Sequence, residues 1–212
     1  MPLQNRVTPV GEIVAHPARG LMMGNRGGPL HDAHRTLGRR RWVSRQWICC
    51  RLSFNDRQRQ VMTPGRYTEL FFLDEATALA AGHRPCFECR RDDSLRFASL
   101  WAAARGHTER ATAPEMDRVL HAERVDEAGR KVTYHAGRGD LPSGTFVRLG
   151  SQPYLVWATR LYPWSPEGYG DPRPLHREPT AMEVLTPRSI VAVLGGGFVP
   201  GVHPSVRPPC SD

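Results

Sequence analysis

The sequence predicts an α+β fold. Some segments are rich in aromatic and aliphatic residues and are bounded by Gly and Pro, a pattern typical of strands, whereas others place apolar residues at helical spacing. At 212 residues with 40% hydrophobic content, the chain is long enough for one domain, or two small ones, with an ordinary buried core. No internal repeat is present, which argues against a solenoid.

The N-terminal half begins with loop-forming residues. The first thirty residues are rich in Gly and Pro, so we expect an irregular segment interrupted by a short strand around residues 11–15. Residues 45–52 and 67–72 are predicted strands because of their aromatic and aliphatic content. A short helix should follow, with Asp74 as its N-cap and Gly82 at its end.

In the second half of the chain, apolar residues first follow a helical spacing and then a strand pattern. Apolar residues at helical spacing predict one helix over 92–105 and another over 114–125. Residues 144–149 and 153–161, joined around Gly150 and Ser151, predict a β-hairpin. Thr186 is expected to cap a last helix that ends at residue 194.

We divide the chain into a basic region over residues 1–110, an α+β region over 111–198 and a Pro-rich, extended tail over 199–212, with a seam near residues 106–113. No stretch approaches the roughly 18 to 20 apolar residues of a membrane helix, and the N-terminus does not resemble a signal peptide. We therefore expect a cytoplasmic protein with no membrane association.

The positive charge is concentrated near the N-terminus. Residues 1–60 contain eleven arginines against three acidic residues, while the rest of the chain is balanced. Arginine interleaved with tryptophan is typical of surfaces that bind nucleic acid, although a solvated basic face is the simpler interpretation. The candidate residues for contacts with DNA or RNA are Arg39, Arg40, Arg41, Trp42, Arg45 and Trp47.

Five cysteines, an odd number, suggest a metal site in a reducing compartment rather than a disulfide framework. Cys86 and Cys89 form a Cys-x-x-Cys, whose turn lets two sulfurs bind one tetrahedral ion, and zinc is the expected metal. Cys49 and Cys50 lie on a predicted strand, where neighbours point to opposite faces, so we expect one of them to reach the metal. His31 is the favoured fourth ligand, with His34, His83 or the second upstream cysteine as alternatives.

The run from Phe71 to Cys89, with its aromatic strand followed by Glu-Ala, Ala-Ala-Gly and Arg-Pro-Cys-x-x-Cys, resembles the zinc-binding domain of the Ada DNA-alkylation-repair protein. With the upstream cysteines, the resemblance extends over residues 49–89. It implies a zinc module and an association with DNA repair. In Ada the upstream cysteines are spaced Cys-x-x-x-Cys and one accepts a methyl group, whereas Cys49 and Cys50 are adjacent, so the resemblance does not extend to methyl transfer.

Several residues outside the cysteines are candidates for catalysis. Asp117 and His121 share one face of a predicted helix and could act as general acid and base, although ordinary ion pairs explain them as well. His121 and Glu123, with the Pro-Cys-x-x-Cys, contain both halves of the zinc deaminase signature in reversed order. Pro2 would become an N-terminal secondary amine after removal of Met1, the nucleophile of some glycosylase-lyases.

Together these patterns predict a zinc-containing nucleic-acid-binding protein, associated with DNA repair. Two other hypotheses stay open. One is an enzyme acting on nucleic acid, of glycosylase/lyase, nuclease or deaminase type, and the other is a zinc-stapled module that binds a protein partner through its basic face. Whether the protein is an enzyme is left undecided by the sequence.

Overall fold

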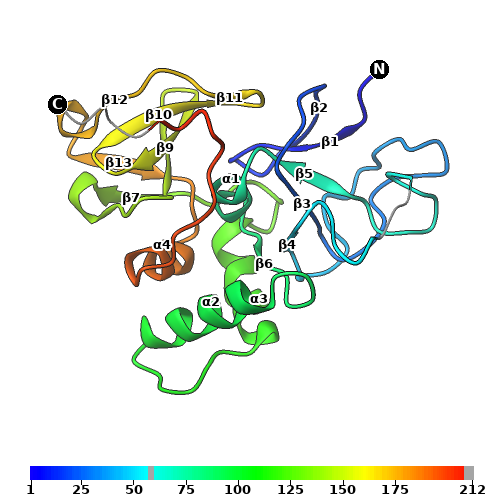
Figure 1. Ribbon diagram of the computed structural model, residues 1–212, viewed down its shortest axis with the longest axis horizontal. Helices are drawn as coiled ribbons and strands as arrows, with labels where there is room; N and C mark the ends of the chain where they lie inside the picture. Colours follow the sequence, from blue (N-terminus) through cyan, green and yellow to red (C-terminus); the bar gives the residue numbers. More distant parts are fainter. Residues whose placement is uncertain (57–59, 208–212) are drawn as a thin grey trace.

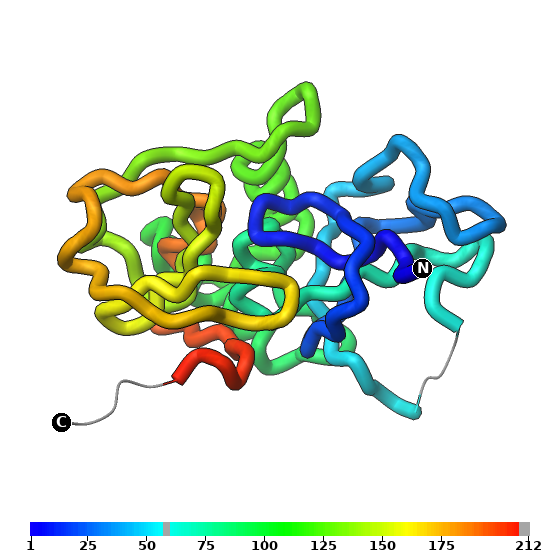
Figure 2. The backbone as a smooth tube through the Cα atoms, turned by 90° about the horizontal axis from the view of Figure 1, so that it is seen from above, coloured from blue at the N-terminus to red at the C-terminus, as the bar shows by residue number. Residues whose placement is uncertain are grey.

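The computed structural model describes residues 1–56 and 60–207. It has the predicted α+β class, with two sheets at opposite ends of the long axis and helix α1 (Glu75–Ala80) between them (Figures 1 and 2). None of the helices in the described residues combines the length and the apolar character that a membrane span requires.

The first sheet has the strand order β2-β1-β5-β3-β4-β6 and is built from the N-terminal part of the chain. Most of its pairs are antiparallel, but β1 pairs with β5, and β4 with β6, in parallel. The predicted strands at 11–15, 45–52 and 67–72 are present in shorter form, whereas β1 and β3 were not expected. The strands are β1 (Gln4–Val7), β2 (Ile13–Ala15), β3 (Met22–Asn25), β4 (Ile48–Cys50), β5 (Leu70–Phe72) and β6 (Arg84–Pro85).

Helix α1 is short and all six of its residues are buried. Its small alanines let three hydrophobic clusters meet around it, one on each sheet and one among the other helices. Asp74 is the N-cap, as predicted, and its carboxylate accepts from the Thr77 backbone N–H at 2.8 Å. Gly82 follows the helix with φ of +87°, a conformation that L side chains rarely adopt.

Helices α2 (Arg91–Ala103), α3 (Ala113–Arg124) and α4 (Arg188–Gly195) pack together around Phe97 and Leu120. The predicted cap of the last helix was wrong. The Thr186 hydroxyl accepts from the Phe146 N–H of the second sheet at 2.8 Å and makes no cap. The carboxylate of Glu123 on α3 instead accepts from the first turn of α4, from the Ser189 N–H at 2.9 Å and its hydroxyl at 2.6 Å.

The second sheet is antiparallel, with the order β11-β10-β9-β8-β13-β7 and β12 beside β10. The predicted hairpin is confirmed as the β8–β9 pair, with its turn at Gly150 and Ser151. The predicted second strand of the hairpin is in fact two, because a turn at residues 158–159 separates β9 from β10. The strands are β7 (Tyr134–Gly137), β8 (Phe146–Leu149), β9 (Gln152–Trp157), β10 (Arg160–Ser165), β11 (Gly168–Tyr169), β12 (Arg173–Pro174) and β13 (Ala181–Val184).

The segment after α4 returns to the N-terminus of α1. The Gly201 N–H donates to Glu75 at 3.0 Å, and the His203 N–H donates to Asp74 at 2.9 Å. Val206 is buried in the cluster between α1 and the second sheet. The described part of the predicted tail, residues 199–207, is therefore packed against the fold, and residues 208–212 lie outside the described residues.

Candidate metal centre

Three cysteine sulfurs form a compact cluster. The Sγ atoms of Cys50, Cys86 and Cys89 all lie within 4.8 Å of one another, and all three residues are buried. A tetrahedral zinc with bonds of about 2.3 Å places its sulfurs roughly 3.8 Å apart. Small shifts of the three side chains would bring the sulfurs to this separation. The cluster could hold a metal ion.

Backbone pairing sets the position of each thiol. Strand β4 carries Cys50, and its neighbour Cys49 pairs with Pro85 of β6 in parallel. The Cys86 N–H then donates to the Cys49 carbonyl at 2.9 Å, and the Arg90 N–H closes the turn on the Cys86 carbonyl at 3.0 Å. The Cys-x-x-Cys turn is thereby held against the end of β4 before α2 begins.

The three thiols hold their protons unequally. The Cys50 thiol donates to the Cys86 sulfur, which raises the pKa of Cys50 and lowers that of Cys86 to about 5, and backbone N–H groups at Glu88 and Cys89 add to the second effect. Burial raises the pKa of Cys89. The hydrogen bond from Cys50 thus favours the thiolate form of Cys86, the form that binds metals, and a cation would displace the remaining thiol protons.

The adjacent Cys49 lies outside the cluster. It faces the core of the first sheet and is fully buried there, as expected for neighbours on a strand. The Arg90 guanidinium approaches its Sγ at 3.7 Å and forms ion pairs with Glu75 at 2.6 Å and Asp93 at 2.9 Å. Arg90 thus links the start of α1 to the cysteine turn.

The structure does not bring His31 to the cysteines. Its Nδ1 lies 2.6 Å from the Thr68 hydroxyl and its Nε2 lies 3.2 Å from the Thr63 carbonyl. The alternative ligand His83 is fully buried among Phe72 and Trp47. Within residues 1–56 and 60–207, no ligand atom of another Cys, His, Asp or Glu joins the three sulfurs.

A cavity of about 720 Å³ lies beside the cluster, and all three cysteines line it. Its other walls come from β3, from β5 and from the loop between β4 and β5. They are partly apolar and include Met23, Ile48, Phe54, Tyr67 and Phe71. A small molecule in this cavity could therefore reach the three cysteines.

The predicted arginine-rich face is exposed in the loop between β3 and β4. Arg39, Arg40, Arg41 and Arg45 are all exposed. Asp32 is the only acidic residue between positions 31 and 51, and its carboxylate accepts from the backbone N–H groups of its own turn. No carboxylate in this loop therefore neutralises these arginines.

The two predicted tryptophans differ. Trp42 is half-buried, with its ring centroid 5.6 Å from that of His121. Trp47 is only 1% exposed, and the guanidinium carbons of Arg26 and Arg124 lie 3.9 Å from its ring centroid. The prediction that Trp47 stacks on a base disagrees with this burial, because both cations already pack on its ring.

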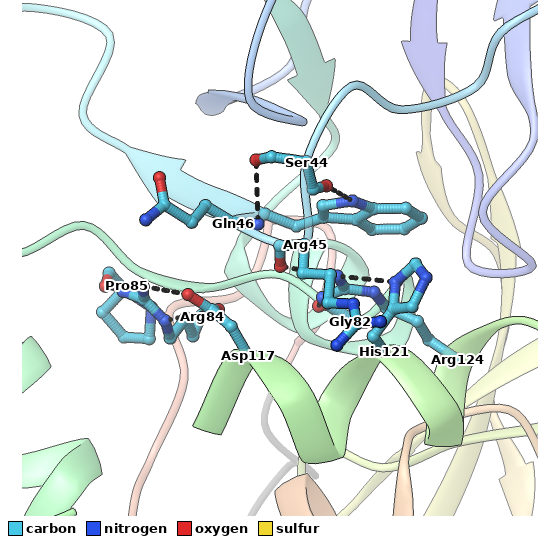
Figure 3. Close-up of polar contacts among 10 residues, drawn as sticks. Ser44, Arg45, Gln46, Gly82, Arg84, Pro85, Asp117, His121 and Arg124 are labelled. Carbon is cyan, nitrogen blue, oxygen red and sulfur yellow. Dashed lines mark hydrogen bonds and ion pairs between the residues drawn. The ribbon is translucent and has the colours of Figure 1, made fainter. Parts of the chain in front are cut away.

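The candidate catalytic residues are engaged in structural contacts. Asp117 is buried and accepts two hydrogen bonds from Arg84, as Figure 3 shows. His121 Nδ1 lies 3.3 Å from an Arg124 nitrogen in the same view. Glu123 caps α4, and Pro2 is exposed at the start of the chain. The structure brings none of these four residues into the cysteine cluster.

The fold and the cluster together define an α+β protein with a three-cysteine candidate metal centre. Comparisons of the chain with known protein families, with curated proteins and with solved structures found no match.

Proposed function

We propose that the protein is a zinc-containing nucleic-acid-binding protein. Cys50, Cys86 and Cys89 would hold the ion, since three clustered thiolates favour zinc over the hard cations Mg²⁺ and Ca²⁺. Zinc in this position would fix the cysteine turn against the end of β4. The resemblance of residues 49–89 to the Ada module supports the same assignment and an association with DNA repair.

The observation that carries nucleic-acid binding is the exposed loop between β3 and β4. Its arginines have no neutralising carboxylate within residues 33–51, so they are available to phosphate groups. The half-buried ring of Trp42 is the aromatic surface beside them. Such a loop favours contacts with the sugar-phosphate backbone over reading of base sequence.

Two measurements on the same preparation test this proposal. Protein purified without added metal should contain about one zinc per chain, and Cys86→Ser should lose it. Labelled DNA and RNA should bind with an affinity that falls steeply with salt. Replacing Arg39, Arg40 and Arg45 by Gln should reduce the slope of log K against log salt by up to about three, since each phosphate contact contributes about 0.9 on duplex DNA.

The matched control replaces Arg110, Arg118 and Arg177, which are exposed elsewhere on the protein and give the same change in net charge. If both triple variants reduce binding equally, only net charge matters and the assignment of the loop is wrong. Binding to an acidic protein but to neither DNA nor RNA would favour the interaction-module hypothesis.

The cavity beside the cysteines favours a second candidate, an enzyme. Structural zinc has four protein ligands, whereas catalytic zinc usually has three and an open position. In cobalt-substituted protein, an open position predicts that added imidazole or a small thiol changes the visible spectrum. If neither ligand changes the spectrum, the metal has no open position and only the structural role is supported.

A further inference from the structure

A second cavity, of about 550 Å³, shares no lining residue with the one beside the cysteines. It lies between the first sheet, the end of α3 and the turn that follows it. Its lining is strongly basic. The residues that matter for its chemistry are Arg26, Arg41, Trp42, Arg124, Arg130 and Lys131.

Two guanidinium groups of this lining are deeply buried. Arg26 and Arg124 are each 1% exposed, and the guanidinium carbon of each lies 3.9 Å from the Trp47 ring centroid. Arg26 and Arg124 donate to the backbone carbonyls of residues 11, 41, 45 and 82, and Arg26 also donates to a nitrogen of His83. The buried Nε of Arg124 has no hydrogen-bond partner. These neutral acceptors satisfy N–H groups but leave the charge uncompensated, which is costly in the interior.

Lys131, the only lysine of the chain, adds a third basic group. Its Nζ donates to the Ala80 carbonyl at 2.6 Å, again a neutral acceptor. Burial, followed by the positive charges of Arg26 and Arg124, lowers the pKa of Lys131 to about 7. The interior of this cavity is thus a strongly positive environment.

Apart from Glu12, the carboxylates near this cavity are already paired with arginines. Arg148, at the cavity rim, is paired with Glu183 at 2.5 Å, and Arg130 is paired with Asp126 at 2.8 Å. Asp117, whose charge acts on Arg124, is bonded at both oxygens to Arg84. Glu12 also lines the cavity, but it is exposed, and none of the ion pairs found among the described residues involves it.

We propose that this cavity binds a phosphorylated small molecule, of the nucleoside monophosphate class. A phosphate dianion would supply the negative charge that the buried Arg26 and Arg124 lack, and Arg41 and Lys131, which also line the cavity, would donate to it. The indole of Trp42 offers a flat apolar wall for a base. A volume of about 550 Å³ suits such a ligand, because small-molecule pockets span about 300 to 1,000 Å³.

The single lysine gives a direct probe. Reductive methylation with ¹³C labels Lys131 and the N-terminal amine and retains the positive charge. Adding AMP to the full-length protein should move the Lys131 methyl signal and raise the apparent pKa of that amine. Ribose 5-phosphate and inorganic phosphate should act more weakly if the base contacts Trp42, and equally well if the phosphate alone is recognised.

Two rim variants test the assignment with unlabelled protein. Arg41→Gln, at an exposed position, and Lys131→Gln should each weaken AMP binding about ten- to a hundredfold, the loss of one charged hydrogen bond. Arg110→Gln, which makes the same charge change on another surface, should leave it unchanged. Because Arg41 is exposed, its variant should fold even if Lys131→Gln does not.

The results separate this inference from the proposed function. Zinc content should be the same in wild type and in the rim variants, since no cavity residue is a metal ligand. The inference is overturned if none of the three phosphate compounds moves the Lys131 signal at millimolar concentration, or if Arg110→Gln weakens binding as much as Arg41→Gln. It is also overturned if only an oligonucleotide binds, because the cavity would then belong to the nucleic-acid surface.

Discussion

The guanidinium of Arg84 donates two hydrogen bonds to the carboxylate of Asp117, at 2.9 and 2.7 Å, with both side chains about 5% exposed or less. Arg84 stands two residues before Cys86, and Asp117 lies in the middle of α3. This ion pair therefore ties the cysteine turn to a helix more than thirty residues later. Figure 3 shows the Arg84 side chain meeting that of Asp117 beside the helix that carries Asp117.

Asp117→Ala should lower the free energy of unfolding by about 3 to 5 kcal/mol, because it leaves the buried Arg84 charge without a partner. Urea unfolding monitored by tryptophan fluorescence measures this loss. Asp171→Ala, at an exposed position, should change stability by less than about 0.5 kcal/mol. If Asp117→Ala has normal stability, the ion pair with Arg84 is not structural, and Asp117 becomes a catalytic candidate again.

Replacing Cys49 and replacing Cys50 should have different effects on metal binding. Cys50→Ser should abolish cobalt or zinc binding, because it removes one of the three clustered sulfurs, whereas Cys49→Ser should retain the metal and lose stability in the core. The sulfur-to-cobalt charge-transfer absorption measures both. Equal loss of this absorption in the two variants would mean that Cys49 moves into the site when metal binds.

Acid should destabilise the protein through His83. Burial, followed by the positive charges of Arg26 and Arg124, lowers the pKa of His83 well below its ordinary value, so the folded state holds it neutral. In the unfolded chain it takes up a proton below a pH of about 6.5. Stability should therefore be fully present above that pH and fall on acidification, with a slope approaching 1.4 kcal/mol per pH unit at about 25 °C.

Unfolding curves between pH 7.5 and about 5.5, a window set around the ordinary histidine pKa, measure this effect. His83→Phe should flatten the dependence, and His107→Gln, at an exposed position, should leave it in place. An identical slope in wild type and His83→Phe would assign the acid sensitivity to other groups.

A side chain at Gly82 would meet two obstacles, an unfavourable backbone conformation and a close neighbouring side chain. Its φ of +87° strains any L residue, and an added Cβ would lie 2.6 Å from Cδ of Arg124. Gly106 has a similar φ of +72° but nothing within 4 Å. Gly106→Ala should therefore cost only the conformational term of about 1 to 2 kcal/mol, and Gly82→Ala should cost a further 1 to 3 kcal/mol, roughly, for the clash. Equal losses in thermal unfolding would show that Arg124 moves aside freely.

The local elements were predictable where one pattern dominates. The Asp74 cap, the helices after it and the β8–β9 hairpin follow from spacing and turn residues that act within a few positions. Strands β1 and β3 were missed because they are short and lie among Gly and Pro. The cap of α4 was assigned to Thr186 because a local hydroxyl fits the rule, whereas the actual acceptor, Glu123, reaches it through tertiary packing.

The candidate metal site could also be predicted only in part from the sequence. The Cys-x-x-Cys spacing and strand alternation indicated two sulfurs from the turn and one from the adjacent pair, but no sequence signal identified Cys50 over Cys49 or excluded His31 from the cluster. The basic cavity was missed entirely. Arg26, Arg124 and Lys131 come from distant parts of the chain, and only the folded arrangement places them around one space.

The return of residues 201–203 to the start of α1 has a consequence for the order of folding during synthesis. The His203 N–H donates to Asp74 and the Gly201 N–H donates to Glu75, so these two carboxylates lack a donor each until nearly the whole chain has left the ribosome. At a synthesis rate of about 5 to 20 residues per second, this delay lasts about 6 to 26 seconds. During that interval the N-terminus of α1 lacks the two hydrogen bonds that the C-terminal segment donates in the folded chain.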